Sequence, residues 1–532
     1  MSHALALTGT RPLLRASLRQ EARGFAPWIA AVTALSASSI LAYAFLFPDA
    51  SDRKALAAAV GGNPALSLIF GPARDLSTTE GFNTWRSLAL GGFLTALMAV
   101  FAVIRASRAQ EDSGQAELLA SGVMDRSTRL AVAVIQTGLA CLAVGVVSCL
   151  VTGLCGSAWA DAVLLSATFT VTGLMFAAVA AVTAQLGSDA RTASTLAVAV
   201  LGCLFLLRGY LDSMDFGDWV TWTTPLGWME RTEPGTGNTW WPLLPGLLLA
   251  VVLLAVAFAL QARRDFGQGA LAPRPGPARG TARSSFGLAW RLNRGPLMSW
   301  TAAFVLLGVV FGNFSTSVTD LLTDNPAAAA VLASGATTPD ALVASFLVTI
   351  LSLIGIIAAI SGVQTMLKVR SEEMEDRVEP VLAGAVGRPS YLGSNIIIAL
   401  TGPTLGVLVA GVLVAVIAGT ADIGVSIGDV LLQTVATVPA VWTATAVSVA
   451  VVGARPQVRI AAWIGVLASF ALTLLGPTFK LPGWALGINP FRHVPHVTAA
   501  SPDWPGLAWI TLATAAFLTL GLAGFRRRDL AR

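Results

Sequence analysis

Apolar stretches of about 20 residues recur along the whole chain, and they constrain its fold more than any other feature. A helix needs about 20 apolar residues to cross the hydrocarbon core of a bilayer, whereas a membrane β-barrel shows shorter alternating segments. Charged residues make up only 12% of the 532 residues, against about a quarter in a soluble domain. The sequence therefore predicts an all-α polytopic membrane protein with twelve transmembrane helices, at about 27–47, 86–105, 128–154, 161–186, 191–211, 241–261, 298–314, 341–367, 390–420, 430–453, 459–477 and 505–525.

The basic residues predict how the chain is oriented. If both termini are cytoplasmic, most of the 34 Lys and Arg residues fall in cytoplasmic loops, as the positive-inside rule requires. We therefore expect a multi-pass protein of the cell (plasma) membrane, in contact with the lipid bilayer. Nucleic-acid binding is not expected, because the basic residues lie in short flanking loops without a concentrated patch.

A charged stretch recurs in the chain. The first island, RAQEDSGQAELLASGVMDR at 108–126, matches the second island, RSEEMEDRVEPVLAGAVGR at 370–388, without a gap. An RRD tripeptide also ends each half, at 263–265 and 527–529. These repeats predict two tandem six-span halves, 1–261 and 298–532, joined by a cytoplasmic linker at 262–297. Because six is even, both halves enter the membrane alike and are expected to be related by a pseudo-twofold axis along the membrane normal.

Each island lies between the second and third spans of its half, on the expected cytoplasmic side. Its first arginine and the glutamate three residues later can pair on a helix. The positive-inside rule explains arginines in such a loop, but it does not explain acids repeated at matched positions. We therefore interpret the islands as docking surfaces for another protein.

Several kinds of chemistry find no support in the sequence. The spans are nearly free of charge, with only Arg208 uncertain near the outer end of the fifth span, and this disfavours an ion-coupled carrier. No lysine lies in a G-x-x-x-x-G-K-[ST] loop, so the chain is not expected to hydrolyse ATP itself. The pair His493 and His496 is interrupted by Pro495 and has no adjacent carboxylate, so neither a metal site nor a catalytic site is expected.

The islands, the six-span unit and the trailing RRD resemble the membrane subunits of type-2 ABC exporters. The duplicated form is similar to the double-length actinobacterial permeases of antibiotic and multidrug efflux, the tetronasin-exporter type, over nearly the whole chain. The first island departs from the second: Asp112 and Ser113 stand opposite Met374 and Glu375. The two docking sites could therefore be unequal.

The resemblance implies a partner and the sites that it contacts. Two copies of a separate cytoplasmic ABC ATPase, which binds the ATP and Mg, would each receive a coupling helix, at 108–122 and 370–384. The segment 11–24 resembles the family's amphipathic connecting helix, and Gly287 to Arg294 is its counterpart in the second half. The implied ATPase-docking residues are Arg108, Glu111, Glu117, Arg126, Arg370, Glu373, Glu379 and Arg388.

The resemblance also implies a path for a small hydrophobic substrate between the halves, lined by the first, second and fifth spans of each. The candidates on these spans are Phe93, Met98, Phe205, Phe346 and Phe470. Apolar residues on membrane helices more often face lipid or a neighbouring helix. The expected cargo is a hydrophobic drug or antibiotic, but its identity is beyond the sequence.

Other classes stay open at this point. A secondary carrier of the major facilitator kind also has twelve spans in two halves, but its loop between spans two and three is rich in glycine and basic residues, whereas the islands are acidic. An ABC exporter of lipid or glycolipid would differ only in its cargo. A membrane enzyme acting on lipid or cell wall would need clustered His, Asp or Glu at an interface, and the sequence shows none.

Overall fold

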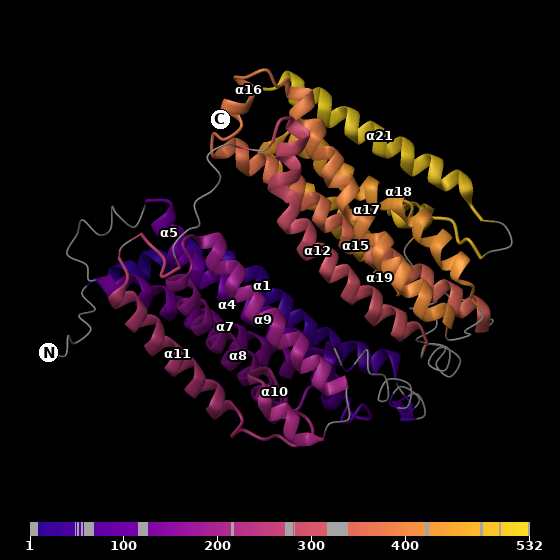
Figure 1. The fold of residues 1–532 in the computed structure, drawn as a ribbon. Coiled ribbons are helices and arrows are strands. Elements are labelled where there is room, and N and C mark those ends of the chain that lie inside the picture. The colour runs from indigo at the N-terminus through magenta and orange to yellow at the C-terminus, as the bar shows by residue number, and fades with distance from the viewer. Residues whose placement is uncertain are drawn as a thin grey trace. The chain divides into compact units, whose positions relative to one another are not determined.

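The computed structural model describes residues 9–47, 69–114, 126–213, 217–265, 267–271, 282–316, 339–420, 425–478, 482–498 and 502–529, with Gly280 and a few isolated positions between 49 and 67. All regular elements in these residues are helices (Figure 1). The chain divides into two compact units, unit 1 (Met1–Gly276) and unit 2 (Pro277–Arg532). The division falls inside the stretch 262–297 that the sequence marks as a linker.

Unit 1 is built around α8 (Trp159–Leu186). This helix packs against α4 (Thr79–Ala106), α7 (Arg126–Leu154) and α11 (Leu243–Arg263), which are the second, third and sixth long helices of the unit. Small residues allow these helices to approach closely. A Cβ added at Gly91 would lie 2.6 Å from the Phe169 ring, and one at Gly173 would lie 2.6 Å from Cys141 Sγ. The other elements of the unit are α1 (Thr10–Leu46), α5 (Arg108–Asp112), α9 (Ala190–Ser213), η1 (Asp218–Thr223) and α10 (Pro225–Glu230).

Unit 2 is built in the same way around α18 (Ile427–Ala454). This helix packs against α15 (Pro339–Met374), α17 (Arg388–Thr420) and α21 (Trp504–Arg527), which are the second, third and sixth long helices of the unit. The other elements are α12 (Ser285–Thr316), α16 (Glu379–Leu382), η2 (Pro456–Trp463), α19 (Ile464–Thr478), α20 (Gly483–Leu486) and η3 (Pro490–His493).

The two units repeat one packing pattern. In each, the first long helix contacts the third, the second contacts the fourth, and the fourth contacts the sixth. The corresponding helices occur in the same order along the two units: α1 corresponds to α12 at the start, and α11 corresponds to α21 at the end. The repeat is therefore structural as well as sequential. The axis expected to relate the two halves stays a prediction.

All twelve predicted spans coincide with helices. Eleven of the helices in the described residues are long and apolar enough to cross a membrane. The helix at the eleventh predicted span, 459–477, is shorter, because the 3-10 segment η2 occupies its beginning and α19 follows. Val458 inside η2 has φ −96° and ψ 43°, which interrupts regular helix at this point.

The segments 11–24 and 287–294 are not separate helices, in contrast to the expected connecting helices. Each forms the first part of a longer helix that continues through a proline, Pro27 in α1 and Pro296 in α12. A proline removes one backbone hydrogen bond, but the flanking turns can hold the helix together across it. The amphipathic pattern of the first segment is nevertheless present, because exposed arginines recur every fourth residue at Arg11, Arg15, Arg19 and Arg23.

Candidate coupling sites at the charged islands

The first island begins with a buried arginine. Arg108 follows α4 almost directly, and its side chain is fully buried. Its guanidinium lies 2.8 Å from Glu111 Oε2 and donates to the carbonyl oxygens of Ser188, Gly267 (3.0 Å) and Gln268 (3.3 Å). These carbonyls belong to the α8–α9 turn and to the segment after α11. One guanidinium, with its several N–H donors, therefore satisfies backbone oxygens that lie beyond helix ends.

Glu111 is the centre of the same cluster. Arg264, the second arginine of the first RRD, donates to its two oxygens at 2.7 and 2.9 Å. Arg129 of α7 lies 3.5 Å away, and Arg264 Nε also donates to Gln185 Oε1 of α8 at 2.6 Å. A single buried carboxylate thus connects the island to α7, to α8 and to the chain after α11.

The second island holds an equivalent arrangement. Glu373, near the end of α15, lies 2.9 Å from Arg370 and 2.5 Å from Arg528, the second arginine of the second RRD. Arg528 Nε donates to the carbonyl oxygen of Gly453 in α18 at 3.0 Å. Arg388 in turn donates to the carbonyl oxygen of Arg528 at 2.7 Å. Glu373 therefore ties α15 to the ends of α18 and α21.

The two islands contain one device, which we call the Glu–Arg clamp: Glu111 with Arg264 in unit 1, and Glu373 with Arg528 in unit 2. Each clamp joins the end of the second span to the end of the sixth. Charged side chains are rarely buried unless they are paired and hydrogen-bonded, and both clamps meet that condition. The sequence signal for the clamp is that RxxE and RRD recur together in each half.

The burial of the clamp residues contradicts part of the predicted docking surface. The sequence pattern predicts that Arg108, Glu111 and Glu373 face a partner, but their side chains are buried and bonded within their own units. They can hold a docking surface in place, but they do not form it. Glu117 lies outside the described residues, and of Arg126 only the backbone is described, as the first residue of α7.

The predicted coupling helices are also shorter than expected. The first, α5, ends at Asp112, and most of the remaining stretch to 122 lies outside the described residues. The second is not one helix over 370–384. α15 ends in a Schellman motif, in which the backbone N–H of Arg377 donates to the carbonyl of Glu372 at 3.0 Å and Asp376 adopts φ 55°. The chain then turns into α16.

An exposed surface remains at this turn. Val378 is 3% exposed and packs into the core of unit 2 with Tyr391 and Leu392, so it anchors the turn to the helices below. The residues around it are exposed, and we call them the second-island surface: Met374, Glu375, Asp376, Arg377, Glu379 and Pro380. Glu379 is thus available to a partner, as the sequence pattern predicts.

The five candidates for the substrate path do not share one environment. Phe93 and Phe205 contact each other edge to face, with their ring centroids 5.0 Å apart. Met98 and Phe346 are each 1% exposed. Phe470 is half exposed. Their roles stay predictions, with Phe93 and Phe205 the pair that the structure brings together.

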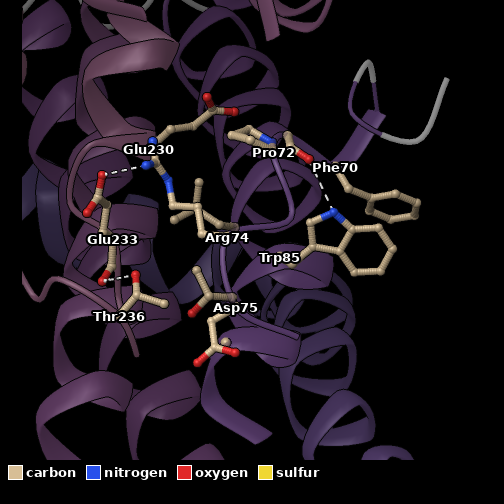
Figure 2. Close-up of a pocket in the computed structure, with 12 residues that line it drawn as sticks. Phe70, Pro72, Arg74, Asp75, Trp85, Glu230, Glu233 and Thr236 are labelled. Atoms are coloured by element: carbon tan, nitrogen blue, oxygen red, sulfur yellow. Dashed lines mark hydrogen bonds and ion pairs between the residues drawn. The ribbon is translucent and has the colours of Figure 1, made fainter. Parts of the chain in front are cut away.

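A second charged cluster lies at the other end of unit 1. Arg208 of α9 is 2% exposed, lies 3.4 Å from Asp212 and pairs with Glu230 at the end of α10. Glu230 also lines a pocket together with Arg74 and Trp85 (Figure 2). Buried ionisable groups are therefore present near the end of the fifth span, although the sequence pattern predicts almost none. The signal for them was the spacing of Arg208 and Asp212, one helical turn apart.

Two like helical units, each with apolar helices of membrane-spanning length, define a duplicated polytopic membrane protein. The family model described as "Multidrug efflux system permease Rv1217c, C-terminal domain" matches the chain twice, at residues 17–260 and 283–526. The multidrug efflux system permease protein Rv1217c of Mycobacterium tuberculosis (strain ATCC 25618 / H37Rv) is 36% identical over 530 residues, which covers 98% of this chain and 95% of that protein. The chain belongs to this family of multidrug efflux permeases, and the predicted tandem repeat is confirmed.

Proposed function

We propose that the chain is the membrane-spanning permease subunit of an ATP-driven ABC exporter that expels hydrophobic drugs or antibiotics from the cell. Two copies of a separate cytoplasmic ATPase bind and hydrolyse ATP with Mg, and both termini of the permease face the cytoplasm. The observation that carries this proposal is a charged island at one end of each unit, repeated in a permease whose sequence contains no phosphate-binding loop.

The clamps supply a mechanical argument for the proposal. A force applied to the second-island surface acts on α15 directly, and it acts on α21 through Glu373 and Arg528. In unit 1 the island reaches α11 through Glu111 and Arg264. It also reaches α9, because Asp112 Oδ2 accepts a hydrogen bond from the N–H of Ala190 at 2.6 Å. An ATPase that moves the islands would therefore move several spans of each unit together.

Arg208 and its two acidic partners are the observation that favours a secondary carrier, because buried ionisable groups can carry a coupling ion. However, this cluster lies at the end of α9 and not midway along it. The repeated islands are not needed by a carrier that works alone. We therefore keep the ATP-driven exporter as the proposed function, with lipid or glycolipid as an alternative cargo.

The first prediction concerns the source of power. The purified chain should neither bind nor hydrolyse ATP, and after gentle solubilisation of the source membranes it should co-purify with a soluble ATPase. In vesicles, export of a fluorescent hydrophobic dye should require both the partner and ATP. Dye export driven by an imposed proton gradient, with the chain alone in proteoliposomes, would show that the protein is a secondary carrier.

The second prediction concerns the docking surface. Replacing Glu375 and Glu379 with lysine should leave folding unchanged, because both side chains are exposed and outside the core. ATPase binding should fall at least several-fold, since complementary charges steer and orient association. Asp503→Lys is the matched control: it reverses an equally exposed acid at the opposite end of unit 2, next to the start of α21. Equal losses of binding in both variants would argue against docking at the second island.

A further inference from the structure

The Arg208 cluster lies at the end of unit 1 opposite the first island. α4 runs between them, since its first turns line the pocket and its last residue precedes Arg108 by two positions. The side chains of Arg208, Asp212 and Glu230 are only 2%, 4% and 6% exposed. The cluster is therefore separate from the coupling sites, and the proposed function assigns it no role.

Two oxygens in this cluster have no hydrogen-bond partner when both acids are ionised. They are Asp212 Oδ2 and Glu230 Oε2, and both are buried. The two carboxyl groups nevertheless lie side by side, because both contact the same guanidinium nitrogen, Nη1 of Arg208. Ionised carboxylates only accept hydrogen bonds, so two of them cannot bond to one another. One proton makes one group a donor, and the pair then satisfies both oxygens.

The charges lead to the same conclusion. Two buried carboxylates share the single guanidinium of Arg208, so these three side chains carry a net charge of −1 when both acids are ionised. Two further arginines both lie near the same acid, Glu233: Arg74 at 3.0 Å (Figure 2) and Arg231 at 3.8 Å. Two buried carboxylates that share one site disfavour each other's ionised form, and one of them then holds a proton instead. The charged groups on the elements around the cluster include Arg74, Asp75, Glu80, Arg86, Arg231 and Glu233.

The cluster also holds three parts of the chain together. Arg208 Nη2 donates to the carbonyl of Ile69 at 3.1 Å, while Glu230 brings in α10. Gly71 packs so closely that an added Cβ would lie 2.8 Å from Glu230 Oε1, and its φ of +89° favours glycine. The segment from Ile69 to Gly71 and helix α10 thus both rest on the end of α9.

We propose that Asp212 and Glu230 form a binding site for one exchangeable proton, held beside Arg208, and that the bound proton keeps α10 and the Ile69–Gly71 segment docked on α9. Loss of the proton leaves two adjacent like charges and loosens this end of unit 1. On the expected orientation this end faces outward, so the site senses the pH outside the cell.

Unit 2 makes a corresponding connection through a neutral hydrogen bond. There Asn489 Nδ2, just after α20, donates to Thr473 Oγ1 of α19 at 2.8 Å. This hydrogen bond joins the fifth long helix to the segment that follows it, as Glu230 does in unit 1. It needs no proton from solution. The arrangement of two buried carboxyl groups therefore distinguishes unit 1 from unit 2 at this connection.

The test uses the purified full-length protein in detergent or nanodiscs. At pH about 7, where free Asp and Glu are ionised, the infrared spectrum of the wild type should contain the carbonyl stretch of a protonated buried carboxyl group. Asp212→Asn should remove that band, because the amide donates to Glu230 as the protonated acid does and leaves Glu230 ionised beside Arg208. Glu230→Gln provides a second variant if the first folds poorly. Asp429→Asn, at a partly exposed acid in the first turn of α18, should keep the band.

Thermal unfolding against pH gives an independent measurement. The folded wild type holds one proton more than the unfolded chain above the ordinary pKa of aspartate, so the stability contributed by the cluster should fall as pH rises. Asp212→Asn should reduce this slope, whereas Asp429→Asn should not. A missing infrared band in the wild type, or equal slopes in the wild type and Asp212→Asn, would overturn the proposal. The proposal would also be overturned if the unfolding temperature depended on the concentration of Na⁺ or methylammonium and not on pH, since a small cation would then occupy the site.

Discussion

Replacing Glu111 with alanine is expected to destabilise the folded protein by about 3–5 kcal/mol, the usual cost of removing one partner from a buried ion pair. Glu111 is the carboxylate shared by Arg108, Arg129 and Arg264. Its loss leaves three cations close together in a buried region at the end of unit 1. We expect a clear fall in the thermal unfolding midpoint of the purified protein in detergent.

The matched control is Glu379→Ala, which removes an equally charged but exposed glutamate from the second island. A surface change of this kind should alter stability by no more than about 0.5 kcal/mol. If the two variants unfold at the same temperature, Glu111 is not engaged as the structure describes. The matched pair thus separates a structural clamp from a docking residue.

The clamp in unit 2 allows a double-mutant cycle. Glu373→Gln and Arg528→Gln should each destabilise the protein, but the double variant should lose less than the sum, because each single change already breaks the same pair. Strict additivity would mean that Glu373 and Arg528 do not interact. A cycle between Glu373 and Arg264, which belong to different units, provides the reference for independent positions.

The helical spans and their duplication could be predicted from the sequence, because they depend on local hydrophobicity and on repeated motifs. The clamps could not, because they depend on contacts between residues far apart in the chain. Glu111 and Arg264 are separated by 153 residues, and Glu373 and Arg528 by 155. In a one-dimensional pattern each looks like an exposed loop charge. Their burial follows only from the packing of the second, fourth and sixth spans.

The end of helix α15 at the second island could not be predicted from the sequence, for a different reason. The stretch from Arg370 to Val378 contains no proline or glycine, so its residue types favour a continuing helix. The helix ends instead because Asp376 adopts a left-handed conformation and Val378 packs into the core. Aspartate tolerates that conformation better than most residues. The end of the helix is therefore set by tertiary packing, which propensities do not contain.

The second large effect is expected where α18 and α21 touch backbone to backbone. A Cβ added at Gly453 would lie 2.1 Å from the carbonyl oxygen of Gly521, and one at Gly521 would lie 2.5 Å from that of Val449. Small residues permit such close approach between membrane helices. Because the obstruction is backbone and not a flexible side chain, Gly453→Val can be accommodated only if the two helices separate.

Gly453→Val should therefore destabilise unit 2 by about 3 kcal/mol or more, at or beyond the upper end of ordinary overpacking. It should also disturb the clamp, since the carbonyl of Gly453 accepts a hydrogen bond from Arg528 at 3.0 Å. Stability can be measured by thermal unfolding, and the clamp by repeating the Glu373–Arg528 cycle in the variant background, where the coupling should shrink. Gly393→Ala is the control: no atom lies within 4 Å of its added Cβ, and replacing a helical glycine with alanine should add about 0.5–1 kcal/mol. A Gly453→Val protein with normal stability and undiminished coupling would show that α18 and α21 are not in direct backbone contact.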